Sequence, residues 1–212
     1  INDNNTIEIN SNNGKYGIAY MDGSEYPKAL LIEDASEINI NSIILEKIIS
    51  STLFASGNDD LRPVMSGVFF QINSENSCFV ATDAHKLVKY TRNDVKNSES
   101  FEFIIPNKPL NILKNNLSDQ KCEVRVLFNK SSAIFSFSDY RLVCRLIEGK
   151  FPNYDAVIPK ENPNILEIDR SLLLQATKRA SIFSSKSTHQ VKLDIKGNSL
   201  KISAEDLDFN NK

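Results

Sequence analysis

The sequence is poor in the residues that build metal and disulfide sites, because its 212 residues include only three cysteines and two histidines. Cys78, Cys122 and Cys144 are odd in number and show no C-x-x-C spacing, and each stands in an apolar, strand-like context. We therefore expect buried, reduced thiols, as in a reducing cytoplasm. His85 and His189 have no neighbouring cysteine or histidine with which to form a metal set, so no metal or other cofactor is expected.

Long apolar runs and a charge excess are also absent. No stretch of about eighteen apolar residues occurs, so nothing predicts a membrane span, and no signal peptide is recognisable. The net charge of −2 indicates neither nucleic-acid nor membrane binding, so any such surface must be local. The composition, 41% hydrophobic and 25% charged, suits a soluble globular protein of one large or two small domains. The chain starts at Ile1 and ends in a polar run, and both ends are expected to belong to something longer.

Apolar periodicity predicts an α+β chain with three amphipathic helices, at 42–54, 108–117 and 171–183. Asn41 or Ser42 is the expected cap of the first helix. The stretch 62–90 has the pattern of an antiparallel meander: strand, polar turn, strand, polar corner, strand. Strands are expected at 7–9, 16–20, 38–41, 64–72, 78–81, 87–88, 101–105, 122–128, 132–137, 140–147, 166–169, 191–195 and 199–204.

Two passages repeat at a domain-sized offset. Tyr16–Pro27 (YGIAYMDGSEYP) resembles Tyr140–Pro152 (YRLVCRLIEGKFP), and each leads into an alternating segment and then an amphipathic helix. The offset of about 125–128 residues is too long for a solenoid repeat. We therefore expect the end of one domain, a complete domain and the beginning of a third. Their ranges are 1–36, 37–162 and 163–212.

The polar corner Thr82-Asp83-Ala84-His85-Lys86 admits three interpretations. A catalytic site would pair Asp83 with His85 as an oriented general base, but no nucleophile motif such as G-x-S-x-G accompanies it. A purely structural turn would hold the same residues. A binding site fits better, because Phe151-Pro152 and Val157 supply a stiff apolar edge, and a shallow groove rimmed by polar residues suits a short peptide.

Basic residues gather on the predicted helices although the chain as a whole is acidic. The helix at 108–117 carries Lys108 and Lys114 with no acid, and the helix at 171–183 carries Lys178 and Arg179. Lys47 in the first helix is offset by Glu46. These cations are either an ordinary solvated face or a positive surface that touches phosphates without reading base sequence.

Four segments resemble one family, the bacterial DNA polymerase III beta subunits or β sliding clamps. They are RPVMSGV at 62–68, VATDAHKLV at 80–88, FIIPNK at 103–108 and RLIEGKFPNY at 145–154. The resemblance keeps the family's order and spacing and covers essentially the whole chain. The sequence departs at Ala84, where the family commonly has glycine, and at Lys86, where it commonly has arginine.

The resemblance implies a DNA-clamp fold of three similar domains per subunit, each with antiparallel β-sheets outside and two helices on the inner face. Two subunits would close head to tail into a ring around double-stranded DNA. The protein would then be a non-catalytic processivity factor of the bacterial cytoplasm and nucleoid. Its partners would be the catalytic subunit of DNA polymerase III, the clamp loader and other proteins that carry a clamp-binding motif.

The same resemblance assigns two sets of residues. Partner peptides would bind between the second and third domains, at Met65, Thr82, Ala84, His85, Lys86, Leu87, Pro152, Ala156 and Val157, with Thr188 extending the site. The helix cations that would face DNA are Lys47, Lys108, Lys114, Lys178 and Arg179. Two rival hypotheses remain at this point: a peptide-binding adaptor with no role on DNA, and a hydrolase that uses Asp83 and His85.

Overall fold

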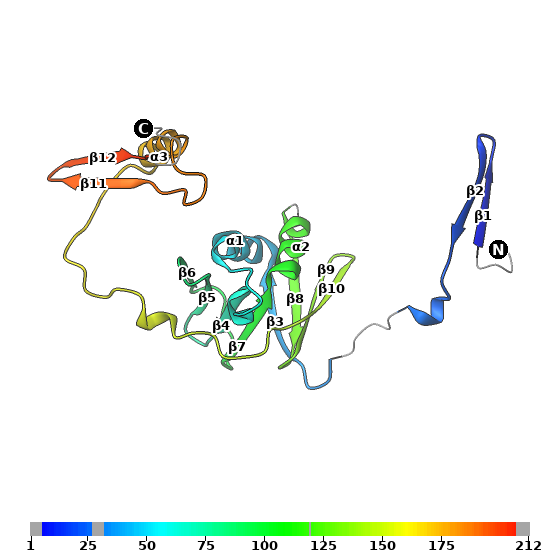
Figure 1. Ribbon diagram of the computed structural model, residues 1–212. Helices are drawn as coiled ribbons and strands as arrows, with labels where there is room; N and C mark the ends of the chain where they lie inside the picture. Colours follow the sequence, from blue (N-terminus) through cyan, green and yellow to red (C-terminus); the bar gives the residue numbers. More distant parts are fainter. Residues whose placement is uncertain (1–5, 27–31, 119, 207–212) are drawn as a thin grey trace. The chain divides into compact units, whose positions relative to one another are not determined.

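The computed structural model describes residues 6–26, 32–118 and 120–206 (Figure 1). The chain divides after Val157 into two compact units, 1–157 and 158–212. Every strand pair in the described residues is antiparallel, and the pairs β4–β5 and β5–β6 form the meander predicted for 62–90.

Two four-stranded sheets form the body of the first unit, with strand orders β10-β9-β8-β3 and β6-β5-β4-β7. The strands are β3 Ser36–Asn41, β4 Gly67–Ile72, β5 Ser77–Thr82, β6 Leu87–Arg92, β7 Phe101–Pro106, β8 Glu123–Phe128, β9 Ser132–Phe137 and β10 Tyr140–Arg145. A bridge between Ile104 and Ile147 joins β7 to the segment that follows β10.

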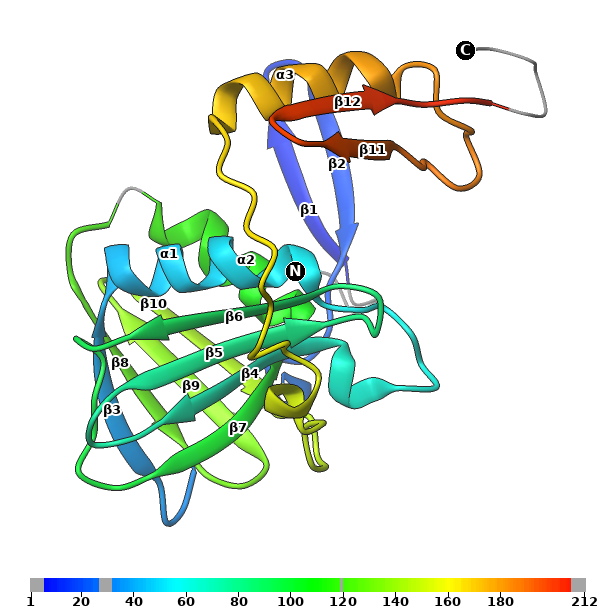
Figure 2. The same cartoon turned by 90° about the vertical axis from the view of Figure 1, so that its left-hand side faces the viewer.

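Two helices, α1 (Ser42–Thr52) and α2 (Asn107–Leu117), pack side by side on the same side of both sheets (Figures 1 and 2). The side chain of Asn41 caps α1 by accepting a hydrogen bond from the Ile43 amide at 3.1 Å. The apolar positions that recur at helical spacing are the buried ones, among them Leu45, Ile48 and Ile49 in α1 and Leu110, Leu113 and Leu117 in α2. Periodicity therefore predicted which helix side faces the sheets.

A chain of aromatic rings runs through the core from one sheet to the other. Phe70 of β4 meets Phe79 of β5 edge-on, with ring centroids 4.9 Å apart, and stacks on Phe103 of β7 at 5.4 Å. Phe103 then contacts Phe128 of β8, in the second sheet, at 4.5 Å. Each buried ring stabilises the fold by about 1.5–3 kcal/mol through burial, and each ring pair adds about 0.5–1.5 kcal/mol.

Two expected strands differ from the structure. Residues 64–65, expected inside a strand, belong to the 3₁₀ turn η3 (Pro63–Met65), because a proline at the first position presets φ for a helical turn. Residues 166–169 alternate in polarity but have no strand partner within the described part of the chain. Alternation alone does not make a strand, since the backbone groups need a neighbouring strand to bond.

The N-terminal residues form a separate hairpin, β1 (Thr6–Ser11) with β2 (Gly14–Ala19), followed by the short 3₁₀ turn η1 (Gly23–Glu25). Pro27, the end of the first repeat passage, lies outside the described residues. Further 3₁₀ turns are η2 (Leu53–Ala55), directly after α1, and η4 (Tyr154–Ala156).

The second unit consists of α3 (Arg170–Ser181) and the hairpin β11 (Lys192–Lys196) with β12 (Ser199–Ser203). Asp169 caps α3 by accepting a hydrogen bond from the Leu172 amide at 2.8 Å. No hydrophobic side chain among the described residues of this unit is buried, and Ile182 remains 75% exposed. An open groove of about 580 Å³ lies between α3 and β12. Within the described residues, the apolar face of α3 is thus left open.

The three thiols are free, and two of them are buried as expected. Cys78 and Cys144 are buried, and Cys122 is half-buried. Burial raises the pKa of the Cys144 thiol to about 11, so it stays protonated at neutral pH. Over the described ranges, no helix has the length and apolar character needed to cross a bilayer, and no cluster of histidine, cysteine and acidic side chains could hold a metal ion.

Gly67 marks the tightest approach between strands. A Cβ on Gly67 would overlap the carbonyl oxygen of Ile105 in the neighbouring strand β7. We expect Gly67→Ala to destabilise the first unit by about 1–3 kcal/mol, because the backbone must move to make room. Urea unfolding followed by circular dichroism measures this. Gly23→Ala is the matched control, since a Cβ there would meet no described residue other than its chain neighbours within 4 Å. Equal losses in both variants would contradict the prediction.

Candidate functional sites

The polar corner between β5 and β6 is closed by its own side chains. The Thr82 hydroxyl donates to the Lys86 carbonyl at 2.8 Å and accepts from the Ala84 amide at 3.1 Å. One carboxylate oxygen of Asp83 accepts from the amides of His85 and Lys86, both at 2.9 Å, and the other pairs with the Lys86 ammonium. Thr82 is only 6% exposed, so its hydroxyl serves the turn.

Asp83 does not form a catalytic pair with His85. The Lys86 ammonium and the two backbone amides hold the pKa of the Asp83 carboxyl well below its usual range. The Asp83 carboxylate forms these hydrogen bonds with two backbone amides and the Lys86 ammonium, and not with the His85 imidazole. Asp83 therefore does not orient that ring as a general base. The geometry therefore gives the hydrolase hypothesis no support.

Ala84 holds a backbone conformation that side chains disfavour. Its φ is +76°, in the left-handed region, where the Cβ of an L-residue crowds its own backbone. The Asp83 and Thr82 hydrogen bonds on either side hold the residue there. The glycine that the family resemblance leads one to expect here would adopt this conformation without that cost.

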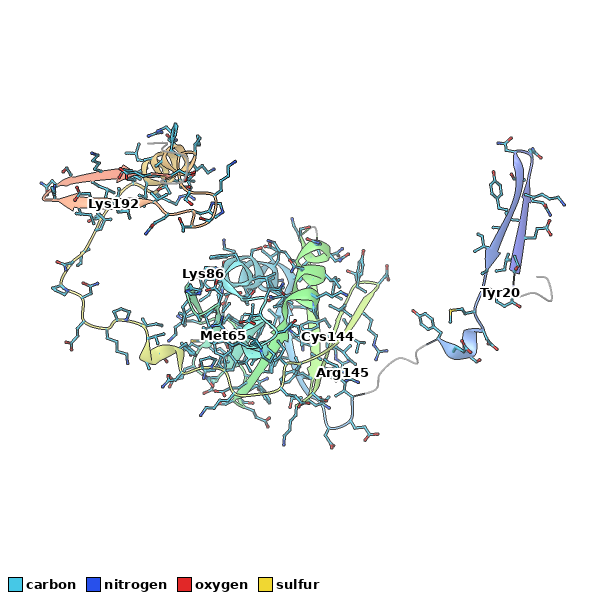
Figure 3. All side chains as sticks on the ribbon, in the orientation of Figure 1. Tyr20, Met65, Lys86, Cys144, Arg145 and Lys192 are labelled. Carbon is cyan, nitrogen blue, oxygen red and sulfur yellow. The ribbon has the colours of Figure 1, made fainter. Side chains whose placement is uncertain are left out.

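Met65 and the corner are held by the same loop. The Gly57 amide donates to the Met65 carbonyl at 2.8 Å, and a Cβ on Gly57 would lie 3.6 Å from the Asp83 Cα. The Asn107 side-chain amide donates to the Gly57 carbonyl at 2.7 Å, which ties the loop to the start of α2. Figure 3 labels Met65 and Lys86 in the part of the first unit that contains β4–β6.

Residues 148–157, which we term the strap, lie on the outer face of the β6-β5-β4-β7 sheet. Phe151 stacks on Phe69 with ring centroids 4.8 Å apart and planes 5° from parallel. The Tyr154 hydroxyl donates to the Gln71 side chain at 2.8 Å, and Asp155 pairs with Lys89 at 2.8 Å. Phe69, Gln71 and Lys89 therefore mark the sheet face turned away from α1 and α2.

The strap brings three of the predicted docking residues, Pro152, Ala156 and Val157, to the sheet face that also carries Leu87. Leu87 stands two residues before Lys89 on β6, and alternate residues of a strand share a face. Val157 is 68% exposed, whereas Leu87, Met65 and Pro152 are half-buried. His85 and Lys86 are exposed in the corner that precedes Leu87. Thr188 belongs to the second unit. That these residues form one docking surface stays a prediction.

The helix cations lie at different angles. Lys47 and Lys108 are exposed, opposite the buried sides of α1 and α2, whereas Lys114 is half-buried on the flank of α2. Lys178 and Arg179 are exposed in the last turn of α3. Across the described ranges, none of these five cations takes part in an ion pair.

The sequence analysis did not identify several residues near the helix cations and near the predicted docking residues. Asn111 and Asn115 are exposed one and two turns after Lys108, on the same side of α2, and amide side chains are common phosphate contacts. Their spacing along the helix is the signal that predicts them. Lys89 and Asp155 carry no such signal, because 66 residues separate them in the sequence.

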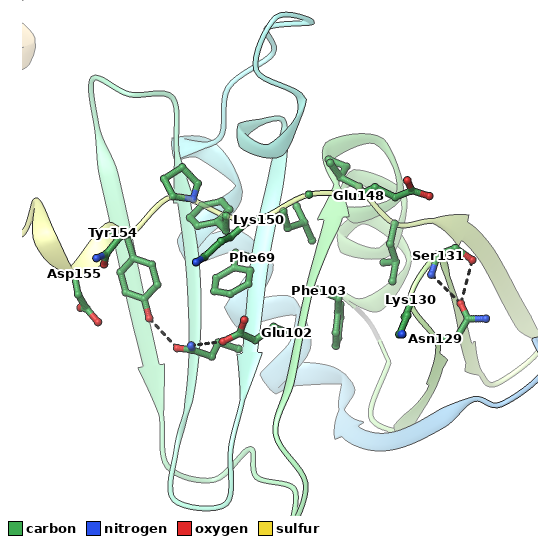
Figure 4. Close-up of a pocket in the computed structure, with 18 residues that line it drawn as sticks. Phe69, Glu102, Phe103, Asn129, Lys130, Ser131, Glu148, Lys150, Tyr154 and Asp155 are labelled. Carbon is green, nitrogen blue, oxygen red and sulfur yellow. Dashed lines mark hydrogen bonds between the residues drawn. The ribbon is translucent and has the colours of Figure 1, made fainter.

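A cavity of about 550 Å³ lies beneath the strap (Figure 4). Its floor includes Phe69 and Phe103, and Glu102, Lys130 and Lys150 stand around it. Pro152 and Tyr154 line it from the strap, so the predicted docking residues and the cavity share this segment.

This arrangement, two helices packed on two antiparallel sheets, is the fold of the sliding clamps. Residues 39–153 match the family model for the central domain of the DNA polymerase III beta subunit, and residues 155–212 match the model for its C-terminal domain. The chain belongs to this family, whose members are non-catalytic accessory subunits.

Individual relatives agree with the family models. The chain is 27% identical over 184 residues to the beta sliding clamp of Bacillus subtilis, covering 86% of this chain and 49% of that protein. It is 26% identical over 196 residues to the Escherichia coli K12 clamp, covering 92% and 54%. The chain thus spans about half the length of the curated relatives it matches.

Solved structures show the same fold. A crystal structure of the Bacillus subtilis sliding clamp superposes with a TM-score of 0.87 at 25% identity, over 98% of this chain and 55% of that one. A sliding clamp from Pseudomonas aeruginosa superposes with a TM-score of 0.86 at 22% identity, over 98% and 56%. The predicted fold class, α+β with a clamp fold, is confirmed.

The conformation of Ala84 leads to a prediction. We expect Ala84→Gly to stabilise the first unit by about 1 kcal/mol, because glycine adopts positive φ without a Cβ clash. The shift of the urea midpoint measures it. Ala156→Gly is the matched control, since Ala156 lies in a 3₁₀ turn without positive φ. An Ala84→Gly variant no more stable than wild type, or one weakened like the control, would refute the prediction.

Proposed function

We propose that the chain is part of a processivity factor that encircles duplex DNA and tethers the replicative polymerase to it. Family membership supports the proposal, and one observation carries it: α1 and α2 present Lys47, Lys108 and Lys114 without ion-pair partners among the described residues. The proposed domain boundaries remain 1–36, 37–162 and 163–212.

The helix surface suits loose contact with phosphates. Helix α2 carries two lysines and no acid, and the exposed amides of Asn111 and Asn115 add neutral donors. The one acid of α1, Glu46, accepts a hydrogen bond from Ser50 in its own helix. A few lysines contribute a salt-screened, sequence-independent attraction, which holds a duplex while leaving it free to slide.

Retention would come from topology. A closed ring, formed in the full-length protein by two subunits head to tail, cannot leave circular DNA sideways, so weak contacts suffice. Partners would then need only a short peptide to dock, and we propose Met65, Leu87, Pro152 and Val157 as the apolar patch that accepts an aliphatic or aromatic anchor. We propose the polymerase III catalytic subunit and the clamp loader as such partners.

The DNA-facing assignment is tested by charge reversal in the full-length protein. We expect the double variant Lys47→Glu/Lys108→Glu to remain less well on circular DNA, and the slope of log affinity against log salt to fall by about two. Linearising the DNA should release wild type. The control double variant is Lys96→Glu/Lys130→Glu, which reverses exposed lysines in loops between strands. Equal losses in both variants, or equal release from circular and linear DNA, would reject the proposal. A peptide-binding adaptor would be indifferent to both variants.

The docking assignment is tested at Leu87. We expect Leu87→Lys to weaken binding of a labelled hexapeptide with adjacent leucine and phenylalanine anchors by about tenfold or more, because it places a charge in an apolar contact. Fluorescence anisotropy on the full-length protein gives the dissociation constant. Leu127→Lys is the matched control, since Leu127 is also half-buried, on strand β8 of the other sheet. Unchanged affinity of Leu87→Lys would contradict the assignment.

A further inference from the structure

The strap is supported at its two ends and spans a cavity in between. At one end the Ile147 amide donates to the Ile104 carbonyl at 3.0 Å. Residues 148–150 then pass along the cavity of about 550 Å³. They pair with no strand of either sheet. The other end, 151–157, carries Pro152, Ala156 and Val157. The position of these residues therefore depends on the Phe151 ring, which stacks on Phe69, and on a small number of contacts near Tyr154.

Those contacts come from two strands of the sheet. The Lys89 ammonium reaches Asp155 at 2.8 Å and lies 5.1 Å from the centre of the Tyr154 ring. The Tyr154 hydroxyl donates to Gln71, whose own amide donates to Glu102 of β7 at 2.8 Å (Figure 4). The hydrogen bond that Lys89 donates to Asp155 also raises the pKa of Lys89, so the lysine stays charged at neutral pH.

We propose that Gln71, Lys89, Tyr154 and Asp155 are positioning residues of the docking surface: they lock the strap onto the sheet and so align Pro152 and Val157 with Leu87. This proposal rests on the proposed peptide-docking function. None of the four belongs to the set that the family resemblance assigned to the peptide. They act through the strap, because their side chains are committed to each other.

These four residues would affect peptide affinity by setting the fraction of molecules whose strap lies in place on the sheet. The apparent dissociation constant is the intrinsic one divided by that fraction. While the strap is mostly in place, the loss of one contact lowers the fraction only a few-fold. Once two contacts are lost, the open state becomes populated and affinity falls steeply. A positioning role therefore predicts that a double variant loses more than the product of its single variants.

The experiment compares Tyr154→Phe, Asp155→Asn and the double variant in the full-length protein. Tyr154→Phe keeps the ring and removes only the hydroxyl bond to Gln71, and Asp155→Asn keeps the size and removes the charge. We expect each single variant to bind the leucine–phenylalanine hexapeptide about two- to fivefold more weakly, and the double variant well over tenfold. Glu37→Gln is the matched control, since it removes the Arg125–Glu37 pair at 2.7 Å on the other sheet.

Two further measurements separate positioning from a general loss of structure. Hydrogen exchange of the segment 147–157 should speed up in the double variant while the urea midpoint of the first unit stays nearly unchanged. Lys89→Asp should weaken peptide binding by setting two carboxylates against each other. The swap Lys89→Asp/Asp155→Lys should restore most of that loss, and added salt should weaken the swapped pair.

The outcomes are distinct. A strap that exchanges faster with peptide affinity unchanged would overturn the positioning role, and so would an unchanged exchange rate in the double variant. Single and double variants that combine by simple multiplication would also overturn it. If Leu87→Lys leaves affinity unchanged, the docking function itself fails. If Leu87→Lys abolishes binding and the strap variants do not affect it, only the positioning proposal fails.

Discussion

The contact between Phe103 and Phe128 is the interaction on which the rest of the first unit depends. It joins two sheets that share no strand pair of their own, and Phe70 and Phe79 extend it under α1. Because the rings fill the space between the sheets, both helices rest on one continuous core, which includes Leu45 and Leu110. The helix surface and the outer sheet face are therefore fixed relative to each other within one body.

Much of this body could be predicted from the sequence because local patterns specify it. The buried sides of α1 and α2 follow from helical spacing, and the meander β4–β6 follows from apolar runs broken by polar turns. The prediction of a strand from alternating polarity failed where no neighbouring strand was available to pair with the segment. Residues 38–41 became strand β3 because β8 pairs with them, whereas the similar segment 166–169 has no strand beside it in the described chain. Sequence pattern gives a segment its preference, and the neighbouring strand decides whether it becomes a strand.

The candidate sites were less predictable, for a different reason. The corner at 82–86 was recognisable as a motif, but the direction of its hydrogen bonds was not. The side chains of Asp83 and Thr82 form their hydrogen bonds within the turn. His85 and Lys86 remain exposed at the surface. The approach of the strap to β6 depends on Lys89 and Asp155, two charged residues that look like ordinary surface positions in the sequence. Contacts made between distant segments leave no local pattern to read.

The first unit has two surfaces that differ in whether their lysines are paired with acids. At the corner and on the outer face of the β6-β5-β4-β7 sheet, Lys86 and Lys89 are each paired with an aspartate, so their charges help to fix the local geometry. On α1 and α2 the lysines stay unpaired within the described residues, so their charge remains available to a partner. Exposed pairs add little stability, but each neutralises its own lysine and helps to hold that side chain in place. A face that must present a small apolar patch benefits from fixed geometry, whereas a face that holds a polyanion loosely benefits from unpaired charge. The core between the sheets keeps these two requirements on separate sides of one body.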